Sequence, residues 1–344
     1  MDKKFSVIIP CYNAEGFVDR AIGSVIRQSL DMSSFEVIAV NDASNDGTLA
    51  KLTEWSKRYP DTVRIITYDT NLRQGGARNR ALKIAEGEYI CFLDADDWME
   101  EDALESFAAV IDAGGYDIVT AKHTEDNVYP SDKDIAAQQA GRDITVERIF
   151  DSGDTKEYIL SDLGFVWESV YRKSMVCGNE VWFPEHLAYE DIYWQRLIRF
   201  YSKKACIIDR ITHHYFYHTA STMNKRNAPH HVDRLTCYEM LLDSYEKRGL
   251  LKKYYPVIMK DAIETYVFNS YFMFFTVMDD IPDVYERIRS VIYKYFPDWE
   301  SMYDDSDIPV VFQYMLKLLK RVKTASPADL QPFKDTVEGM LNGL

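Results

Sequence analysis

The chain has 344 residues, of which 47% are hydrophobic and 28% charged, and its formal net charge at pH 7 is −15. This composition is that of a globular protein of roughly two domains, and the acidic balance argues against nucleic acid as a partner. The 5 cysteines are scattered without a C-x-x-C pair, which favours a reducing cytoplasm. Because neither a secretion signal nor an apolar run of about 18 residues is present, we expect a cytoplasmic protein without a transmembrane helix.

The segment 6–18, SVIIPCYNAEGFV, has the pattern of a buried strand followed by a helix. The apolar run at 7–9 ends at Pro10, which has no N–H to donate to a sheet. Asn13 is expected to begin a helix with one apolar face. Tyr12 lies in the turn between the two elements. Its ring could stack on a nucleotide base or pack at an interface of the core.

The segment 35–48, FEVIAVNDASNDGT, predicts a second buried strand, a polar turn and a helix over about 48–59. Asn45 or Asp46 is expected to cap that helix. Asp42 follows the strand directly, and its carboxylate could accept the ring N–H of uracil, thymine or guanine. The alternative is an aspartate that only stabilises the turn.

The segment 71–82, NLRQGGARNRAL, places Arg78 and Arg80 near the start of a predicted helix. Cations at that end oppose the helix dipole, and an anionic ligand would relieve the conflict. Arginines on the surface of a loop are an equally ordinary explanation. Further strands are predicted at 63–68 and 117–122.

The segment 92–98, FLDADDW, predicts a buried strand that ends in closely spaced carboxylates. Alternate residues of an extended chain share a face, so Asp94 and Asp96 should point together. Two converging carboxylates suit a hard divalent cation, which usually completes its shell with substrate phosphates. Asp97 with Glu100 three residues later is also a helix-start pattern, and we assign Asp97 mainly to capping.

Strands and helices alternate in this half, and the unusual polar residues follow the strands. This order predicts an α/β fold with a doubly wound, mostly parallel, Rossmann-like sheet that binds a ligand at its carboxyl edge. Motifs for a dinucleotide dehydrogenase or a P-loop NTPase are missing. From about residue 228 the pattern becomes helical. We therefore expect a nucleotide-binding domain over 1–225, with an insertion at about 123–160 over the acceptor side, and a helical domain over 226–344.

Four motifs carry a resemblance to a known family: SVIIPCYNAEGFV, VNDASNDGT, ARN at 77–79 and FLDADD. In this order and spacing they resemble the family 2 glycosyltransferases of the GT-A fold, over about residues 5–225. The resemblance implies an inverting transfer of one sugar from a nucleotide-sugar, commonly a UDP-sugar, to a glycan or lipid-linked glycan acceptor. It also implies Mn²⁺ or Mg²⁺ on the diphosphate and a place in surface polysaccharide assembly.

The resemblance implies two sets of donor-side residues. Those assigned to the nucleotide-sugar are Pro10, Tyr12, Asn13, Asp42, Arg78, Asp94, Ala95, Ser221 and Thr222, and those assigned to the metal are Asp96 and His218. His218, Ser221 and Thr222 could equally be ordinary residues at the end of a strand. The chain departs from the family at Arg73, where glycine is common, and at Ser169, where a lysine is common.

The segment 183–200 places Glu190 and Asp191 at the start of a predicted helix. Adjacent helical residues lie about 100° apart, so the two carboxylates cannot perform the same task. An acidic pair at a helix start can also simply stabilise the dipole. The resemblance implies that Asp191 deprotonates the acceptor hydroxyl, with Glu190 as its catalytic companion.

Several features leave two interpretations open. Trp167, Trp182 and Trp194 could form an apolar wall for a sugar ring or belong to the core. The apolar segment 267–278 suits a buried helix or a homodimer contact, and 310–324 suits either a helix packed on its neighbours or one that contacts an anionic membrane on its inner face.

Two other function classes share parts of this sequence pattern. A sugar-nucleotide pyrophosphorylase would need a glycine-rich basic loop after the first strand, which CYNAEGF is not. A binding module without transferase activity would keep the nucleotide pocket but has no need of both Asp96 and Asp191.

Overall fold

The computed structural model describes residues 3–126, 143–161, 164–217, 225–278, 284–306, 308–321, 335 and 339. The chain forms two compact units, Met1–His218 and Thr219–Leu344. We describe each unit by itself.

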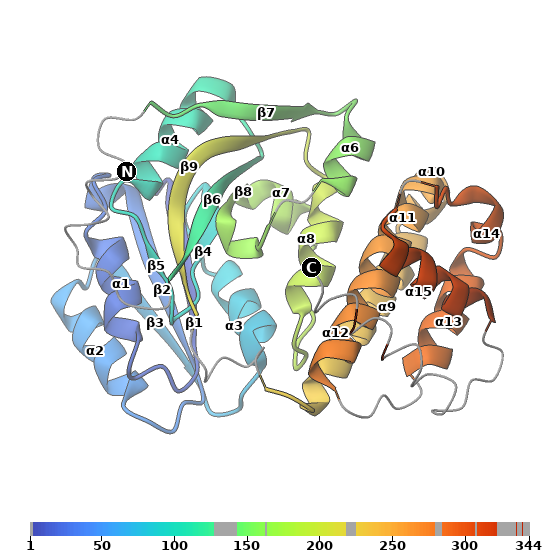
Figure 1. The fold of residues 1–344 in the computed structure, drawn as a ribbon. Helices are drawn as coiled ribbons and strands as arrows, with labels where there is room; N and C mark the ends of the chain where they lie inside the picture. Colours follow the sequence, from blue (N-terminus) through green and yellow to red (C-terminus); the bar gives the residue numbers. More distant parts are fainter. Residues whose placement is uncertain are drawn as a thin grey trace. The chain divides into compact units, whose positions relative to one another are not determined.

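Nine strands in the described part of the first unit form one sheet in the order β3-β2-β1-β4-β8-β6-β9-β5, and β7 pairs with β9 (Figure 1). The strands are β1 (Phe5–Cys11), β2 (Phe35–Asp42), β3 (Val63–Tyr68), β4 (Tyr89–Phe92), β5 (Trp98–Met99), β6 (Ile118–Asp126), β7 (Val146–Asp151), β8 (Ser169–Arg172) and β9 (Lys204–Phe216). Strands β3, β2, β1 and β4 are parallel, as are β6 and β9, and antiparallel pairings of β8, β5 and β7 complete the sheet. The predicted α/β class with a doubly wound sheet is confirmed.

Helices cover both faces of this sheet, with α1, α2 and α4 on one side and α3, α7 and α8 on the other (Figure 1). The helices are α1 (Val18–Ile26), α2 (Thr48–Arg58), α3 (Arg73–Leu82), α4 (Ala103–Gly114), α6 (Thr155–Leu160), α7 (Lys173–Gly178) and α8 (Glu190–Arg199), with short 3₁₀ turns at Met32–Ser34 and Val166–Glu168. Every residue of β1 and β2 is buried, as expected for central parallel strands whose two faces are covered. Their centres, at 7–9 and 37–40, are therefore continuous apolar runs rather than alternating ones.

Two predicted helix starts are corrected. Helix α1 begins at Val18, because Asn13 adopts a left-handed backbone with φ of 50°. The Oδ1 atom of Asn13 instead accepts a hydrogen bond from the N–H of Asn45, 2.8 Å away, which ties the first two polar turns together. Helix α4 begins at Ala103 rather than directly after Asp97. The prediction for α2 was better, since Asp46 Oδ1 accepts from the Thr48 N–H at 3.0 Å.

The described part of the predicted insertion at 123–160 is regular structure. Strand β6 continues to Asp126, β7 pairs antiparallel with β9, and α6 follows. The sequence of β7 looked unpatterned because Phe150 is its only buried side chain, which is the composition of a charged edge strand. The expected loop around Pro130 lies outside the described residues.

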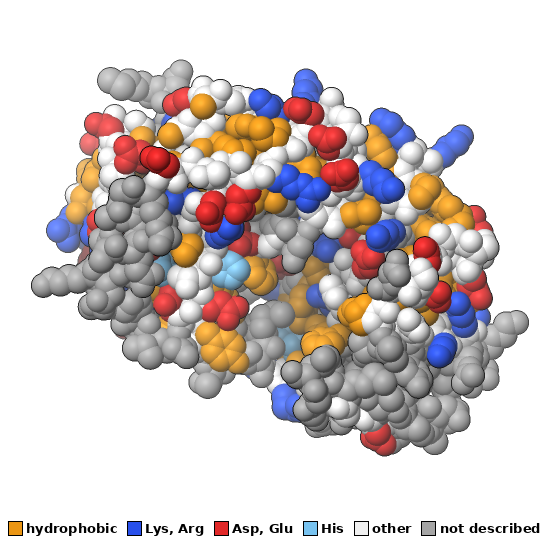
Figure 2. Space-filling view, turned by 45° about the horizontal axis from the view of Figure 1, so that its top comes forward, with side chains coloured by type: hydrophobic (Ala, Val, Ile, Leu, Met, Phe, Trp, Pro, Cys, Tyr) orange, Lys and Arg blue, Asp and Glu red, His pale blue; other side chains and the backbone are white. Residues whose placement is uncertain are grey.

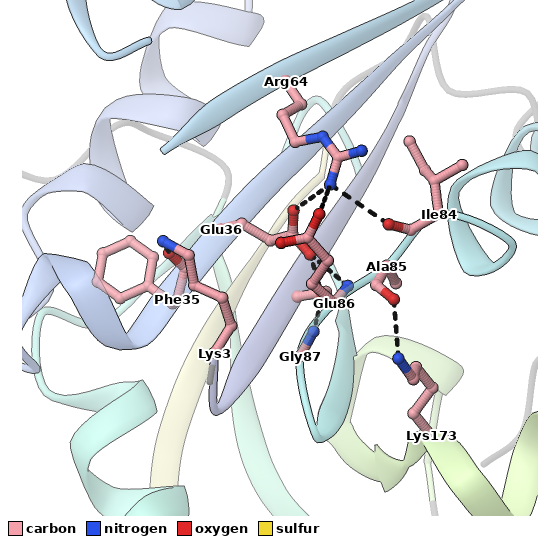
Figure 3. Close-up of polar contacts among 10 residues, drawn as sticks. Lys3, Phe35, Glu36, Arg64, Ile84, Ala85, Glu86, Gly87 and Lys173 are labelled. Atoms are coloured by element: carbon pink, nitrogen blue, oxygen red, sulfur yellow. Dashed lines mark hydrogen bonds and ion pairs between the residues drawn. The ribbon is translucent and has the colours of Figure 1, made fainter. Parts of the chain in front are cut away.

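A buried carboxylate braces the amino-terminal edge of the sheet, away from the polar turns (Figure 3). Glu36 accepts hydrogen bonds from Ser6 Oγ at 2.7 Å, the Glu86 N–H at 2.6 Å and Arg64 Nη1 at 3.0 Å. Beside it, the ammonium groups of Lys3 and Lys173 donate to backbone carbonyls. An open depression of about 590 Å³ lies at this edge, and both lysines line it. Their ammonium groups are engaged in the hydrogen bonds to the backbone.

We expect Glu36→Ala to lower the free energy of unfolding by about 2–4 kcal/mol, because it leaves a buried hydroxyl and a backbone N–H without their acceptor. Glu86→Ala is the matched control, since the largely exposed Glu86 carboxylate pairs with the same Arg64. Its cost should stay below about 1 kcal/mol. Urea unfolding followed by circular dichroism measures both. Equal losses in the two variants would contradict the bracing role of Glu36.

The second unit is helical in its described residues, as predicted. Its helices are a 3₁₀ turn at Pro229–Val232, α9 (Asp233–Lys247), α10 (Leu250–Lys253), α11 (Tyr255–Asp261), a π-helical segment at Ala262–Phe268, α12 (Asn269–Val277), α13 (Val284–Tyr295), α14 (Trp299–Met302) and α15 (Val310–Arg321). Leucines and tyrosines of α9 and aromatic residues of the π-helical segment are buried, and Tyr238 of α9 stacks on Tyr266 with ring centroids 5.2 Å apart.

The apolar side of α15 is used inside the second unit. Met315, Leu316 and Leu319 are buried, and the ring of Phe312 stacks on Phe268 at 4.6 Å. These contacts support the interpretation of a packed amphipathic helix, and the alternative of a membrane contact stays a prediction. Within the described ranges, every helix is too short or too polar to traverse a bilayer.

Candidate functional site

The polar turns meet at one buried arginine. Arg78 lies within α3 and is only 1% exposed. Its Nη2 is 2.7 Å from Asp94 Oδ1, just after β4, and its Nη1 is 2.5 Å from Glu190 Oε1, at the start of α8. This guanidinium joins the carboxylate loop of the first half of the unit to the acidic helix start of the second half.

The acidic groups lie close enough to influence one another. Burial raises the pKa of Asp94, the Arg78 charge opposes this shift, and the Asp96 charge adds to it. Burial, together with the charges of Asp96 and Asp94, raises the pKa of Asp97 to about 9. The Asp191 charge also acts on both Asp94 and Arg78. The described residues of the site therefore form a compact group of acidic side chains around the buried Arg78 charge.

Asp97 is not the helix cap that the sequence suggested. Its side chain is 1% exposed, and its Oδ1 accepts a hydrogen bond from the Phe216 N–H at 2.8 Å, at the end of β9. Its buried Oδ2 has no hydrogen-bond partner among the described residues. Helix α4 begins six positions later, and its N-cap position is Asp102, whose side chain forms no capping hydrogen bond.

The donor atoms of this loop suit a divalent cation held by few protein ligands. The described ranges contain no cluster of three or more His, Cys, Asp and Glu side chains that could enclose a metal. A cation would nevertheless relieve the repulsion that raises the pKa values of Asp94 and Asp97, and carboxylate oxygens with added diphosphate oxygens are ligands that Mg²⁺ and Mn²⁺ accept. The second predicted ligand, His218, lies outside the described residues, as do Ser221 and Thr222.

The arginines of α3 find their counter-charges within the protein. Arg78 is paired with Asp94 and Glu190, and Arg80 is paired with Glu185. Arg78 lies within α3 and Arg80 in its last turn, so the predicted position near the helix start is wrong and the expected conflict with the helix dipole does not arise. The assignment of Arg78 to the nucleotide side consequently rests on the resemblance alone.

The predicted base-binding residues differ in exposure. Tyr12 is 51% exposed, so its ring is available for stacking. Asp42 is buried, and both its carboxylate oxygens accept from the Leu72 N–H, at 2.8 and 3.1 Å. Burial raises the pKa of Asp42 against the lowering effect of these hydrogen bonds. Asp42 thus holds the loop before α3. The alternative interpretation was a contact within its own turn, whereas this contact joins residues 30 positions apart.

The remaining predicted donor-side residues lie in β1 and in the loops that follow β1 and β4. Pro10 lies in buried β1 and Ala95 is 8% exposed between the two aspartates. The N–H of Asn13 donates to Ser44 Oγ at 3.1 Å, so Asn13 shapes the loop that carries Tyr12.

Glu190 and Asp191 face different surroundings, as their angular separation requires. Glu190 is 4% exposed, and its pKa rises to about 7 because burial outweighs the lowering effect of Arg78, with a further raising effect of Asp191. Asp191 is half-buried, and its Oδ1 accepts from the Ile192 N–H at 3.0 Å. Tyr189, directly before them, has a left-handed backbone that sets the turn into α8.

We expect Arg78→Met to lower the free energy of unfolding by about 3–5 kcal/mol, because it leaves two carboxylates in a poorly solvated site without their cation. Arg80→Met is the matched control, because Arg80 forms a partly exposed pair on the same helix and should cost about 1 kcal/mol or less. Denaturant unfolding at pH 7 measures both. If the two variants lose equal stability, the pairing of Arg78 is not a structural requirement.

The three candidate tryptophans have separate environments. Trp194 is fully buried and stacks on Phe183 at 4.6 Å, so it belongs to the core. Trp182 lies under the ammonium group of Lys83. Trp167 is 4% exposed but stacks on Phe165, which is 47% exposed. Phe165 was missed by sequence reasoning, because a single aromatic residue after a glycine carries no recognisable signal.

The histidines of β9 are structural. Nε2 and Nδ1 of His214 each lie 2.6 Å from a carboxylate oxygen, of Glu100 and Asp126 respectively, and its ring stacks on Trp98. His213 is fully buried, and its Nδ1 is 2.9 Å from Thr212 Oγ1. Burial lowers the pKa of His213 from its ordinary value of 6.5 to about 3.

The burial of His213 predicts a stability loss in acid. Between pH 6.5 and about 3 the unfolded chain binds a proton at this residue that the folded chain does not, so stability falls as the pH drops through this window. The expected slope is about 1.4 kcal/mol per pH unit, and His213→Gln should lack it in urea unfolding at pH 6.5, 5.5 and 4.5.

His123→Gln is the control with the opposite sign, because the Glu168 carboxylate raises the pKa of His123 in the folded state. A wild-type slope that survives unchanged in His213→Gln would refute the assignment.

Comparisons with known proteins agree with the architecture. Residues 6–157 match the family model described as Glycosyl transferase family 2. The poly(ribitol-phosphate) β-N-acetylglucosaminyltransferase TarS of Staphylococcus aureus is 29% identical over 187 residues, which cover 54% of this chain and 30% of that protein. The putative glycosyltransferase EpsH of Bacillus subtilis is 26% identical over 260 residues, which cover 72% of this chain and 71% of EpsH.

The fold is also found in a solved structure. The crystal structure of S. aureus TarS 1–349 in complex with UDP-GlcNAc superimposes with a TM-score of 0.72 at 19% sequence identity, over 99% of this chain and 92% of that one. The chain thus shares its fold with this TarS fragment, although it matches less than a third of the length of the whole TarS sequence. Residues 6–157 thus match glycosyltransferase family 2, and the chain has a GT-A-like fold.

Proposed function

We propose that the protein is an inverting glycosyltransferase that moves one sugar from a nucleotide-sugar to a glycan or lipid-linked glycan acceptor in the assembly of a surface polysaccharide. The single observation that carries this proposal is the Arg78 bridge between Asp94 and Glu190. It holds a carboxylate loop suited to a cation beside a second acidic element suited to a base. The match of residues 6–157 to the family model supports the reaction class, and the UDP-GlcNAc bound by TarS makes a UDP-sugar the first donor to test.

On the donor side, Tyr12 is assigned to stacking on the base and Asp42 to its ring N–H, with Pro10, Asn13 and Ala95 shaping the pocket. Asp94 is assigned to the ribose and metal region, and Asp96 is the assigned ligand of Mn²⁺ or Mg²⁺. When bound, the cation supplies positive charge to the leaving diphosphate. His218, Ser221 and Thr222 complete the predicted phosphate and metal contacts from outside the described residues.

On the acceptor side, Asp191 is assigned to accept the proton of the attacking hydroxyl. It lies at the start of α8, while the adjacent Glu190 is occupied by Arg78, so Glu190 is the positioning residue of the pair. A carboxylate is a weak base for a sugar hydroxyl, and the proton is transferred late, as the new bond forms. Attack from the face opposite the leaving diphosphate gives inversion in a single displacement.

A protein that binds a polyanion such as nucleic acid usually presents a continuous basic surface to it. On the face that Figure 2 shows, lysine and arginine side chains of the described residues are interspersed among acidic ones rather than gathered in one basic patch. This distribution agrees with a small, doubly charged donor bound at one site, and it gives no support to a polyanionic partner.

The test is a panel of UDP-, GDP- and TDP-sugars with and without Mn²⁺. We expect metal-dependent thermal stabilisation by one nucleotide class and slow hydrolysis of that donor, detected as released nucleoside diphosphate. Stabilisation without hydrolysis or transfer would identify a binding module. Formation of a nucleotide-sugar from a nucleoside triphosphate and a sugar 1-phosphate would identify a pyrophosphorylase.

A further inference from the structure

Three aromatic rings of the first unit form a surface that we call the aromatic platform: Phe165, Trp167 and Tyr215. The ring centroids of Phe165 and Trp167 are 5.0 Å apart, and those of Trp167 and Tyr215 are 6.1 Å apart. The three ring planes agree within 10°. Trp167 is buried whereas Phe165 is 47% exposed, so the stack is supported from inside and open at Phe165.

The platform is held rigidly. Glu168, which is 5% exposed, accepts a hydrogen bond from the Phe165 N–H through Oε2 and lies 2.5 Å from His123 Nδ1 through Oε1. The His123 ring packs edge-on against both Phe165 and Trp167. Gly164 has a φ of 60°, and a Cβ there would overlap the Glu168 carboxylate. An isolated exposed phenylalanine needs no explanation, but one whose backbone and neighbours are fixed in this way is preorganised for contact.

The platform is anchored on both sides of the candidate active site. The Nε2 of Gln195 donates to the Gly164 carbonyl at 2.9 Å. Gln195 follows Asp191 by one helical turn on the same side of α8, about 6 Å along the axis. On the other side, Tyr215 is followed by Phe216, whose N–H donates to Asp97. The platform is therefore connected by hydrogen bonds to the helix that carries Asp191 and, through β9, to the carboxylate loop.

The charges around the platform disfavour an anionic guest. The positive charge of His123 is balanced by Glu168. Glu125 is exposed, and it is the cross-strand neighbour of Tyr215 in the parallel pairing of β6 with β9. Ser169, next to Glu168, is a neutral hydroxyl that contacts Thr120. An exposed aromatic face beside an acidic side chain suits a neutral ligand that presents C–H groups.

We propose that the aromatic platform is an acceptor subsite that binds the C–H face of a neutral pyranose ring and holds its reacting hydroxyl towards Asp191. The inference rests on the proposed transferase function and adds the substrate class, a sugar ring rather than a polyol phosphate chain. The exposed ring of Phe165 gives a sugar ring an aromatic contact surface that the stack behind it supports, and the hydroxyls at the edge of the sugar remain available for hydrogen bonds.

The test uses the full chain with UDP and Mn²⁺ and measures saturation-transfer NMR of the methyl pyranosides of glucose, galactose, mannose and N-acetylglucosamine. Ribitol 5-phosphate is the anionic polyol arm. We expect at least one pyranoside to bind, and its Kd to rise about tenfold in Phe165→Ala, which corresponds to the upper range for an aromatic contact. Phe165→Tyr should keep the affinity, because it keeps the ring face. Phe272→Ala, which removes an exposed ring of the second unit, is the matched control, and melting temperatures show that each variant is folded.

Three results would overturn the subsite: no pyranoside binds the wild-type protein, Phe165→Ala binds it within twofold of wild type, or ribitol 5-phosphate gives the stronger Phe165-dependent signal. Failure of the proposed function looks different. In that case the wild-type protein neither binds nor hydrolyses any nucleotide-sugar, whereas an active donor site with Phe165-independent pyranoside binding rejects only the subsite.

Discussion

Asp191→Asn is expected to lower the kcat of sugar transfer by about 10²–10⁴-fold, the range for removing a positioned general base. The amide is close in shape to the carboxylate and can still accept from the Ile192 N–H, so the start of α8 should be kept. Asp191 is half-buried at the helix start, and the change should cost little stability. Transfer is measured as disaccharide formation, and donor affinity as the UDP-dependent thermal shift, which we expect to be unchanged.

Glu190→Gln is the matched control, because it changes the neighbouring carboxylate in the same way. It weakens the contact with the buried Arg78 charge and leaves Asp94 as its remaining carboxylate partner, so its main effect should be a lower melting temperature. Comparing the activity and the melting temperature of the two variants distinguishes the catalytic base from the positioning residue. If Asp191→Asn keeps more than a tenth of the wild-type kcat, or if Glu190→Gln loses activity at full stability, the two assignments must be exchanged.

Much of the fold could be predicted because buried parallel strands have a strong local signature. The runs at 7–9 and 37–40 are apolar throughout, since helices cover both faces of the sheet, and polar residues follow soon after each run. The edge strand β7 could not be recognised in the same way. Only Phe150 is buried there, so the strand is specified by its pairing with β9 and not by its own pattern.

The residues of the candidate site could be proposed from the sequence, but the contacts between them could not. Asp94 and Asp96 were found because they follow a strand end, whereas the partner of Arg78 in α8 is 112 positions away and no local rule connects the two. Asp97 was misjudged because the spacing to Glu100 imitates a capping box, while the true contact, with Phe216, depends on how β9 passes the loop. Phe165 was missed because the stack depends on Tyr215, which belongs to another strand.

Asp96→Asn is expected to abolish the part of donor stabilisation that depends on Mn²⁺ or Mg²⁺. The position is chosen from the geometry of the loop: Asp94 is paired with Arg78, Asp97 is buried beneath the Phe216 amide, and the Asp96 charge acts on both. At a donor concentration of about 100 times Kd, bound ligand adds about 2.7 kcal/mol to the stability, and the metal-dependent share of this gain should disappear.

Turnover should fall with it, by about 10³-fold if the cation contributes about 4 kcal/mol to stabilising the leaving diphosphate. Asp191→Asn is the control for this readout, because it should lose transfer but keep the metal-dependent shift. Asp61→Asn, a change of a surface aspartate near α2, should keep both. The measurement is a thermal-shift titration of UDP-sugar with Mn²⁺ or with EDTA. A full Mn²⁺-dependent shift in Asp96→Asn would place the cation elsewhere, and a shift that EDTA leaves intact in the wild-type protein would show that donor binding at this site does not use a metal.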